Sequence, residues 1–265
     1  MEILSERGYM VVATNTDIDY VGCARRLAAS VKHWHPDAKL CLLSDQLHDA
    51  PEFDYQKQFP FGDQCQNQTW KLANDWQVGT ASPFRQTIKL EADMLICGPI
   101  DHWWNQLQHL DVCISTGARN FYDSPAESRF YRKVFDVNGL PDVYNAIVYW
   151  RLSKTAHEFW QWVKTIFRRW EKYRTLLKFP DDEPTTDLVY AMAAQIMGPE
   201  RVTQPWATYP KIVHMKKHMI PTYNSDWTKE LVWEMDDNCL RIQTVAQWGA
   251  FHYHHKDWTP YGSDH

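Results

Sequence analysis

Two acidic side chains, Glu91 and Asp93, follow a strand-like run at residues 87–90 and are separated only by Ala92. In extended geometry, residues i and i+2 point to the same side of the chain. The two carboxylates are therefore expected to approach one divalent cation together, directly or through water. Oxygen ligands suit Mg²⁺ or Mn²⁺, and an added imidazole shifts the preference toward Mn²⁺.

A second group of candidate ligands lies in the run Phe-His-Tyr-His-His-Lys at residues 251–256. Six of the 12 histidines follow residue 210. If the run is a strand, His252 and His254 share a face, so one of them can complete the metal shell while Lys256 pairs with a phosphate. The sequence does not choose between the two rings, and a solvated His-rich tail is the competing interpretation.

The acidic pair needs a scaffold, and the first half of the chain alternates strand-like and helix-like segments. Apolar residues recur at spacings of three, four or seven between Val21 and Trp34, which predicts a helix. We expect strands at residues 9–13, 40–43, 87–90 and 112–114, and another helix at residues 70–76. This alternation implies βαβ units and a mostly parallel sheet, with the acidic pair at the carboxyl end of a strand, where ligands bind.

The second half of the chain is more mixed. Residues 143–150 predict a long strand, and residues 250–253 a last one. Apolar side chains between Ala156 and Trp170 recur with helical spacing, as do those between Leu188 and Met197. No linker divides the chain, so we expect a single domain over residues 1–265.

Composition bounds the function. A chain of 265 residues with 44% hydrophobic and 23% charged residues is typical of one globular domain. The 14 Trp, 13 Tyr and 11 Phe form an aromatic core or line clefts that suit sugars and bases. A formal net charge of -5 argues against a tight, non-specific nucleic-acid binder.

The cysteines and the apolar runs of the sequence predict the cellular compartment of the protein. The six Cys contain no CxxC pair, which argues against a zinc ribbon or a thioredoxin-like site. Unpatterned cysteines are typical of a reduced protein. The first residues lack a signal-peptide pattern, and no apolar run is long enough to span a membrane. We therefore expect a cytoplasmic protein with no membrane partner.

Several short motifs acquire meaning from their order along the chain. They are Thr14-Asn15 after the first strand, Lys71, Arg85, Glu91-Ala92-Asp93, Asn145, Asp182-Glu183 and the late His-Lys cluster. Over residues 8–258 this order resembles the GT-A glycosyltransferases, especially the glycogenin and galactosyltransferase-like family eight. The resemblance implies an α/β fold, namely a Rossmann-like nucleotide-binding α/β sandwich with a mostly parallel central sheet. Residues 130–150 and the turn at 181–184 look most similar to glycosyltransferases of T-even-like phages and cyanophages.

The resemblance implies donor contacts in the first half of the chain, about residues 8–115. Thr14 and Asn15 would contact the uracil or ribose of a UDP-sugar, and Tyr20 would stack near the base. Lys71 and Arg85 would lie near the ribose, sugar or diphosphate. The remaining half, about residues 116–265, would face the acceptor.

The same resemblance assigns the metal. Asp93 would bind it, with Glu91 beside it touching metal or ribose. His254 or His252 would be the late metal ligand, and Lys256 would contact the diphosphate. The pattern departs from the family at Glu91, where Asp is usual, and after His252, where the usual spacing before Lys is missing.

Catalytic roles toward the transferred sugar fall by resemblance on Asn145 and on Asp182 or Glu183. The strand continues Ala146-Ile147 after Asn145, where the family has Gly. The implied reaction is transfer of a sugar from a nucleotide-sugar to a hydroxyl group, with Mn²⁺ or Mg²⁺ as cofactor. A divalent ion stabilises the charge that a diphosphate leaving group gathers, by several kcal/mol.

The phage resemblance implies an acceptor and a location. The acceptor is hydroxymethylated cytosine in phage DNA, which receives glucose or arabinose in the host cytoplasm. Alternatives are a surface glycan or protein acceptor, a non-catalytic nucleotide or carbohydrate binder on the same fold, and a metal-dependent hydrolase that uses the same carboxylates and histidine.

Surface residues offer a thinner argument for DNA. Two basic stretches could meet a phosphate backbone: Lys164, Arg168, Arg169, Lys172, Arg174 and Lys178, and then Lys211, Lys216, Lys217 and His218. Four aromatic residues could stack on an extruded base or an acceptor sugar: Trp206, Tyr209, Tyr223 and Trp227. A solvated helix face is the competing interpretation of the first basic stretch.

Overall fold

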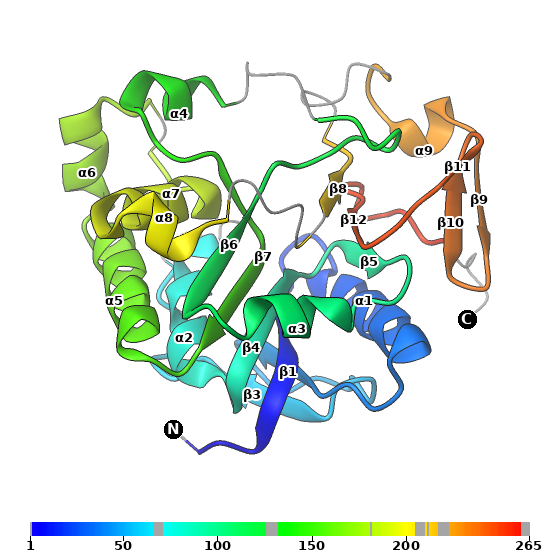
Figure 1. Ribbon diagram of the computed structural model, residues 1–265, viewed down its shortest axis with the longest axis horizontal. Helices are drawn as coiled ribbons and strands as arrows, with labels where there is room; N and C mark the ends of the chain where they lie inside the picture. Colours follow the sequence, from blue (N-terminus) through cyan, green and yellow to red (C-terminus); the bar gives the residue numbers. More distant parts are fainter. Residues whose placement is uncertain are drawn as a thin grey trace.

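A six-stranded sheet forms the centre of the computed structural model, which describes residues 2–65, 71–125, 132–180, 182–204, 210, 212–216 and 223–260. The strands are β1 (Ser5–Val12), β2 (Leu40–Ser44), β3 (Tyr55–Gln58), β4 (Phe84–Glu91), β6 (Val112–Thr116) and β7 (Val143–Arg151). Their order is β3-β2-β1-β4-β7-β6, and only β7 runs against the others (Figure 1). The predicted α/β fold with a mostly parallel sheet is confirmed.

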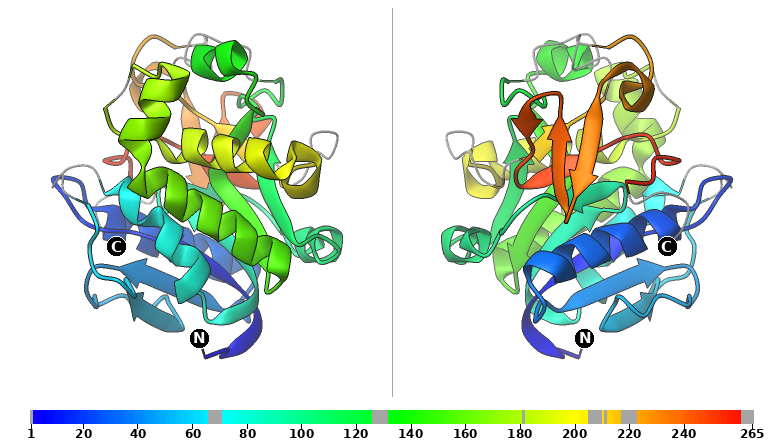
Figure 2. Two further views of the ribbon diagram at one scale, coloured as in Figure 1. Left: turned by 90° about the vertical axis from the view of Figure 1, so that its left-hand side faces the viewer. Right: turned by 90° about the vertical axis from the view of Figure 1, so that its right-hand side faces the viewer.

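Helices cover both faces of this sheet because successive strand residues point to opposite sides. In β1, Tyr9 and Val11 belong to one core and Met10 to the other. Side chains of α1 (Tyr20–Trp34) and α3 (His102–Leu107) complete the first core. The second core contains η1 (Leu72–Gln77), α2 (Val78–Ala81), α5 (Lys154–Arg168) and α7 (Thr186–Met197), and Figure 2 shows the two sides in turn.

The amphipathic helix α5 illustrates how the second face is closed. Phe159, Val163 and Ile166 recur at helical spacing and are fully buried. Burying one such side chain stabilises the fold by roughly 1.5–3 kcal/mol. The helix ends at Arg168 and a separate helix, α6 (Trp170–Leu177), follows, so the prediction of one continuous helix through Trp170 was wrong at its end.

A second, three-stranded sheet positions the late histidines. It consists of β5 (Met94–Ile96), β12 (Ala250–His252) and β8 (Ile212–His214), with β12 in the middle. β12 is antiparallel to β5 and parallel to β8, so His252 lies opposite Met94 on one side and His214 on the other. This pairing brings the turn after β4 against the ends of β8 and β12.

The remaining described elements lie around this frame. They are α4 (Lys133–Asn138), α8 (Pro199–Val202), α9 (Trp227–Glu230) and a meander of β9 (Trp233–Asp236), β10 (Cys239–Ile242) and β11 (Val245–Ala246). Asp237 and Asn238 both have positive φ, as the tight turns of two-residue hairpins require. No helix in the described ranges combines the length and the apolar character needed to cross a membrane.

The partly exposed carboxylate of Asp54 ties the edge of the central sheet to α1. It lies 2.8 Å from the Nζ atoms of both Lys32 and Lys39, and it accepts a hydrogen bond from the backbone N–H of Leu40 at 3.0 Å. Burial alone raises the pKa of Asp54, but the two ammonium groups and the backbone donor outweigh it and lower the pKa to about 2.

We predict that Asp54→Asn lowers the free energy of unfolding by about 1–2 kcal/mol at pH 7. The folded-state pKa is depressed, so this contribution is present above pH 4 and is lost as the pH falls toward 2. Urea unfolding at pH 7, 4 and 3 measures the difference. Asp37→Asn, which changes an exposed carboxylate nearby, should alter stability by less than about 0.5 kcal/mol. An Asp54→Asn deficit of equal size at pH 7 and 3 would contradict the assignment.

Candidate active site

A cavity of about 380 Å³ opens at the carboxyl edge of the central sheet. It is lined by the ends of β1 and β4, by the amino-terminal end of the reversed strand β7, by the first turn of α7 and by the ends of β8 and β12. In open α/β sheets this edge is where ligands bind. The cavity volume lies in the range that small-molecule sites occupy.

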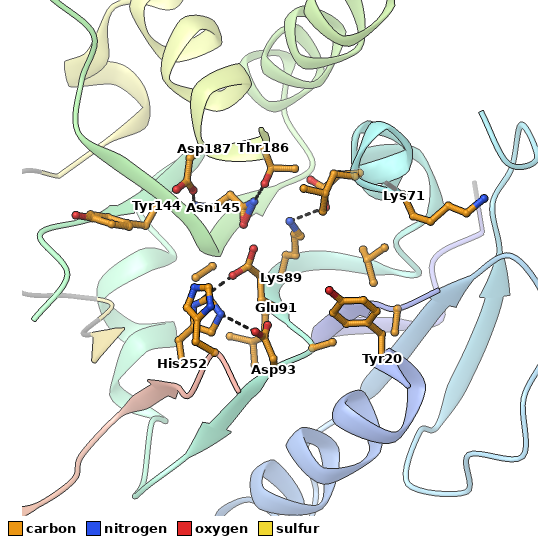
Figure 3. A pocket seen from close by; sticks show the side chains of 18 of the residues that line it. Tyr20, Lys71, Lys89, Glu91, Asp93, Tyr144, Asn145, Thr186, Asp187 and His252 are labelled. Atoms are coloured by element: carbon orange, nitrogen blue, oxygen red, sulfur yellow. Dashed lines mark hydrogen bonds and ion pairs between the residues drawn. The ribbon is translucent and has the colours of Figure 1, made fainter. Parts of the chain in front are cut away.

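The two predicted carboxylates meet at one histidine in this cavity. Glu91 ends β4, whereas Asp93 lies in the turn before β5, so the expected continuous extended geometry was wrong. The turn still directs both side chains toward His252, as Figure 3 shows. Oε2 of Glu91 lies 3.5 Å from Nδ1 of His252, and Oδ2 of Asp93 lies 2.9 Å from Nε2.

Electrostatics separate the two acids. Burial raises the pKa of Glu91 to about 7. Burial also acts to raise the pKa of Asp93, but His252 and Lys256 outweigh it and hold that pKa well below its ordinary value. The ammonium of Lys256 lies 2.6 Å from Oδ2 of Asp93. Of these two acids, Asp93 is therefore the one that ionises more readily.

The structure distinguishes the two late histidines by their neighbours. Glu91, Asp93 and His252 have ligand atoms within 4.8 Å of one another, and His254 belongs to a different group of three, with His252 and His214. The rings of His252 and His254 stack at 4.8 Å, although the strand ends at His252. His214 escaped the sequence analysis because the three-residue strand β8 gives no periodic signal.

The donor-side predictions fall partly inside the cavity. Thr14 and Tyr20 line it, and Tyr20 stands at the start of α1 (Figure 3). Oγ1 of Thr14 is buried without a hydrogen-bond partner among the described residues, so it is available to a ligand. Asn15 is exposed and does not line the cavity: its side chain accepts a hydrogen bond from the N–H of Val21 at 2.8 Å.

The two predicted basic residues differ in position. Lys71 lines the cavity, and its ammonium lies 2.5 Å from Asp63. Arg85 is at the opposite end of β4, where it pairs with Glu6 at 3.2 Å. Arg85 precedes Glu91 by six positions along the strand, which is roughly 20 Å at about 3.3 Å per residue. The structure thus corrects the expectation that Arg85 reaches the same ligand.

The wall opposite the carboxylates is built from β7 and the start of α7. Asn145 donates from Nδ2 to Thr186, while its Oδ1 is buried without a partner in the described part of the chain. Asp187 accepts from the N–H of Asn145 at 2.7 Å and pairs with Arg132 at 2.8 Å. Figure 3 shows Asn145, Thr186 and Asp187 side by side across from Glu91.

Asp182 and Glu183 lie outside this cavity, which corrects the expectation that they face the same ligand as Asn145. Asp182 is largely exposed and pairs with Arg174 at 2.8 Å. Both acids line a separate hollow beside Arg168. They precede the start of α7, whereas the carboxylate of Asp187, within its first turn, is the one that lines the cavity.

A buried ion pair that the sequence analysis missed forms another part of the wall. Lys89 points from β4 into the cavity lining, and its Nζ lies 2.6 Å from Oδ1 of Asp75. Tyr190 donates a hydrogen bond to the other carboxylate oxygen. The available signal was a lysine between Ile88 and Leu90 in a predicted strand, because a buried charge requires a partner.

The basic and aromatic residues proposed for DNA binding lie in different kinds of position. Tyr223 and Trp227 are buried in the core and donate to backbone carbonyls, so they cannot stack on a base. Lys216 lines the cavity, and burial lowers its pKa to about 8. Five of these predicted residues, and residue 181 of the predicted turn, lie outside the described residues: Trp206, Tyr209, Lys211, Lys217 and His218.

The donor set fits a divalent cation. Glu91, Asp93 and His252 supply two carboxylates and one imidazole, a combination that accepts Mn²⁺ more readily than Mg²⁺. The unpartnered oxygens of Thr14 and Asn145 fit a ligand rich in hydroxyl or N–H groups. The cavity therefore has the features of a site for a metal-bound polar ligand.

Comparison with solved structures identifies the architecture. The galactosyltransferase LgtC, in complex with donor and acceptor sugar analogs, superposes with a TM-score of 0.56 at 12% identity, over 96% of this chain and 92% of that one. The apo form of mouse xyloside xylosyltransferase 1 gives a TM-score of 0.56 at 8% identity, over 97% and 100%. The chain has the GT-A fold. No protein-family model matches the sequence, and neither does any curated protein.

We predict that Lys89→Met destabilises this GT-A fold by about 3–5 kcal/mol, because it leaves the Asp75 carboxylate buried without its cation. The double variant Lys89→Met with Asp75→Asn should recover part of that loss. Urea unfolding of the two single variants and the double variant measures the coupling. Lys57→Met on the edge strand β3 is the control and should change stability by about 0.5 kcal/mol or less. Strictly additive losses would show that the two charges do not interact.

Proposed function

We propose that this chain is a metal-dependent glycosyltransferase that moves a sugar from a nucleotide-sugar, UDP-linked, to a hydroxyl acceptor. The observation that carries the proposal is the meeting of Glu91, Asp93 and His252 at the ligand-binding edge of a GT-A fold. The similar structure of LgtC holds donor and acceptor sugar analogs. The sequence resemblance to family eight and to phage glycosyltransferases supports the same reaction class.

Glu91, Asp93 and His252 would hold the cation, which supplies Lewis-acid stabilisation to the diphosphate leaving group. Lys256, already beside Asp93, adds a positive charge for that diphosphate. Thr14 and Tyr20 lie where the nucleoside end of the donor would lie, at the end of β1 and the start of α1. In this assignment, residues of about 8–115 bind the donor, and residues of about 116–265 face the acceptor.

Asn145 is the residue we assign to the transferred sugar. Its Oδ1 is buried, lines the cavity and accepts no hydrogen bond within the described ranges, so a sugar hydroxyl can satisfy it. Its backbone N–H and side-chain amide are fixed by Asp187 and Thr186. Asp187, rather than Asp182 or Glu183, is the acid that can approach the same sugar.

Two other functions use the same residues. A non-catalytic nucleotide or carbohydrate binder needs the cavity, but it has less need of a metal site next to a paired lysine. A metal-dependent hydrolase would release the sugar to water and ignore a hydroxyl acceptor. Product analysis with and without an added acceptor separates these functions from transfer.

We predict that Asp93→Ala lowers the rate of UDP release at least 100-fold in a panel of UDP-sugars with Mn²⁺, because loss of this ligand removes several kcal/mol of stabilisation. Circular dichroism should show an unchanged fold. Asp49→Ala, at an exposed position, is the control and should keep the parent rate. Near-normal turnover by Asp93→Ala would remove Asp93 from the reaction, and the absence of UDP release from any donor would favour the binder.

The acceptor that we propose is hydroxymethylated cytosine in DNA, with glucose or arabinose as the sugar and the host cytoplasm as the location. The sequence resemblance to T-even-like phage enzymes supports it, together with the exposed cations Arg168, Arg169 and Lys172 at the junction of α5 and α6. Mass spectrometry of a hydroxymethylcytosine duplex incubated with nucleotide-sugars tests it. Mass added to a glycan or protein acceptor, and none to the duplex, would support the alternative.

We predict that Arg168→Ala with Arg169→Ala weakens binding to this duplex and lowers the slope of log Kd against log salt by about 1–2. The reason is that the variant makes fewer phosphate contacts and so releases fewer counterions on binding. Fluorescence anisotropy at several salt concentrations measures the slope. Lys133→Ala on α4 is the control and should leave it unchanged. An unaltered slope in the double variant would show that the α5–α6 junction does not touch DNA.

A further inference from the structure

His252 also belongs to a group of three histidine rings, together with His214 and His254. His214 ends β8, His252 ends β12, and the two residues are direct neighbours in the parallel pairing of these strands. His254 follows two residues later, and its ring lies 5.1 Å from that of His214 and 4.8 Å from that of His252. One nitrogen from each ring lies within 4.8 Å of the others.

The spacing of the nitrogens suits a cation. Nδ1 of His214 and Nδ1 of His252 are 3.0 Å apart. Two nitrogen ligands of a tetrahedral Zn²⁺, each 2.0–2.1 Å from the ion, are about 3.3 Å apart. The two nitrogens, which share a hydrogen bond here, are thus within a few tenths of an ångström of the spacing of two zinc ligands.

The backbone of His254 is held in an uncommon conformation. Its φ is +66°, in the left-handed region that non-glycine residues rarely adopt. This turn breaks the extended path of β12 and stacks the His254 ring over that of His252. Such strain persists only where surrounding contacts fix it, and here its effect is to complete the group of three rings.

Asp93 supplies the outer support that metal-binding histidines require. Nε2 of His252 lies 2.9 Å from Oδ2 of Asp93, so the N–H at this nitrogen donates to a carboxylate. In the neutral ring this arrangement leaves the lone pair on Nδ1, which lies 3.0 Å from Nδ1 of His214 and 3.5 Å from Oε2 of Glu91. A histidine ligand whose other nitrogen donates to a carboxylate is the usual arrangement around zinc.

From this geometry we propose that His214, His252 and His254 form a second cation site, specific for a late first-row ion such as Zn²⁺. Three neutral imidazoles bind Zn²⁺, Co²⁺ or Cu²⁺ far better than Mg²⁺ or Mn²⁺, which prefer oxygen. The site differs from the one assigned to Mn²⁺, which consists of Glu91, Asp93 and one nitrogen of the same His252.

The two sites share one ring, and this has a consequence. Neutral imidazole has a single lone pair, so His252 can serve only one ion at a time. When Zn²⁺ occupies the three-histidine site, the lone pair of His252 is no longer available to an ion bound by Glu91 and Asp93. Binding of Zn²⁺ and of Mn²⁺ is therefore antagonistic, whatever sugar or nucleotide the protein uses.

Calorimetric titration of the chelator-treated full chain with ZnCl₂ tests the site without any substrate, and Co²⁺ reports coordination through its visible absorption. His214→Gln and His254→Gln should each raise the Kd for Zn²⁺ at least tenfold and weaken the intense bands of low-coordinate Co²⁺. His255→Gln, a ring outside the group that faces Asp226, is the control and should stay within twofold. Glu91→Gln should reduce Mn²⁺ binding and leave Zn²⁺ binding within about threefold.

Several results would overturn the proposal. They are the absence of Zn²⁺ binding by the parent chain, an unchanged Kd in whichever of the two histidine variants keeps a native thermal melting curve, and an equal loss of Zn²⁺ binding in Glu91→Gln. We expect added Zn²⁺ to release bound Mn²⁺, and electron paramagnetic resonance measures this release. Simultaneous binding of both ions would refute the shared lone pair. Zinc binding can be absent while the transferase assay succeeds, and zinc can bind while the transferase assay fails. The two proposals are therefore tested independently.

Discussion

The contact on which this site depends is the Asp93 carboxylate held between Nε2 of His252 and Nζ of Lys256. It joins the turn after β4 to a segment about 160 residues later in the chain. The contact exists only because β12 inserts between β5 and β8 in one register. A slip of one residue would turn the His252 side chain to the other face of that small sheet. The register of three short strands therefore decides whether Glu91, Asp93 and His252 meet in the cavity.

Charge pairing organises the rest of the cavity. An isolated ion in a low-dielectric interior is expensive, so each buried charge is retained beside an opposite one. Lys89 faces Asp75, and the guanidinium of Arg132 faces Asp187. With these side chains fixed, the polar atoms that remain unsatisfied are informative, and the oxygen of Asn145 is one of them. The cavity is preorganised in charge and incomplete in hydrogen bonding, which is the state expected of a site that awaits a polar ligand.

The sequence predicts the parts of this fold whose signal is local. Helix α1 follows from apolar periodicity, strand β4 follows from the strand-like run at residues 87–90, and the acid pair follows from its position after that strand. The short strands β5 and β8 carry no such signal, because three residues are too few to show a period. Arg85 was misplaced for another reason: its identity and order matched a family, but a straight strand carries it away from the cavity.

The late histidines show why residue type and spacing leave a site underdetermined. Spacing of two correctly suggests that His252 and His254 lie together, yet the strand ends at the first of them and the second returns through a left-handed turn. The rings then have different partners, carboxylates for one and His214 for the other. That division depends on β8, which no local pattern reveals. His252 belongs to both groups, because Nε2 faces Asp93 while Nδ1 lies near both His214 and Glu91. Residue type and spacing alone could not reveal this shared position.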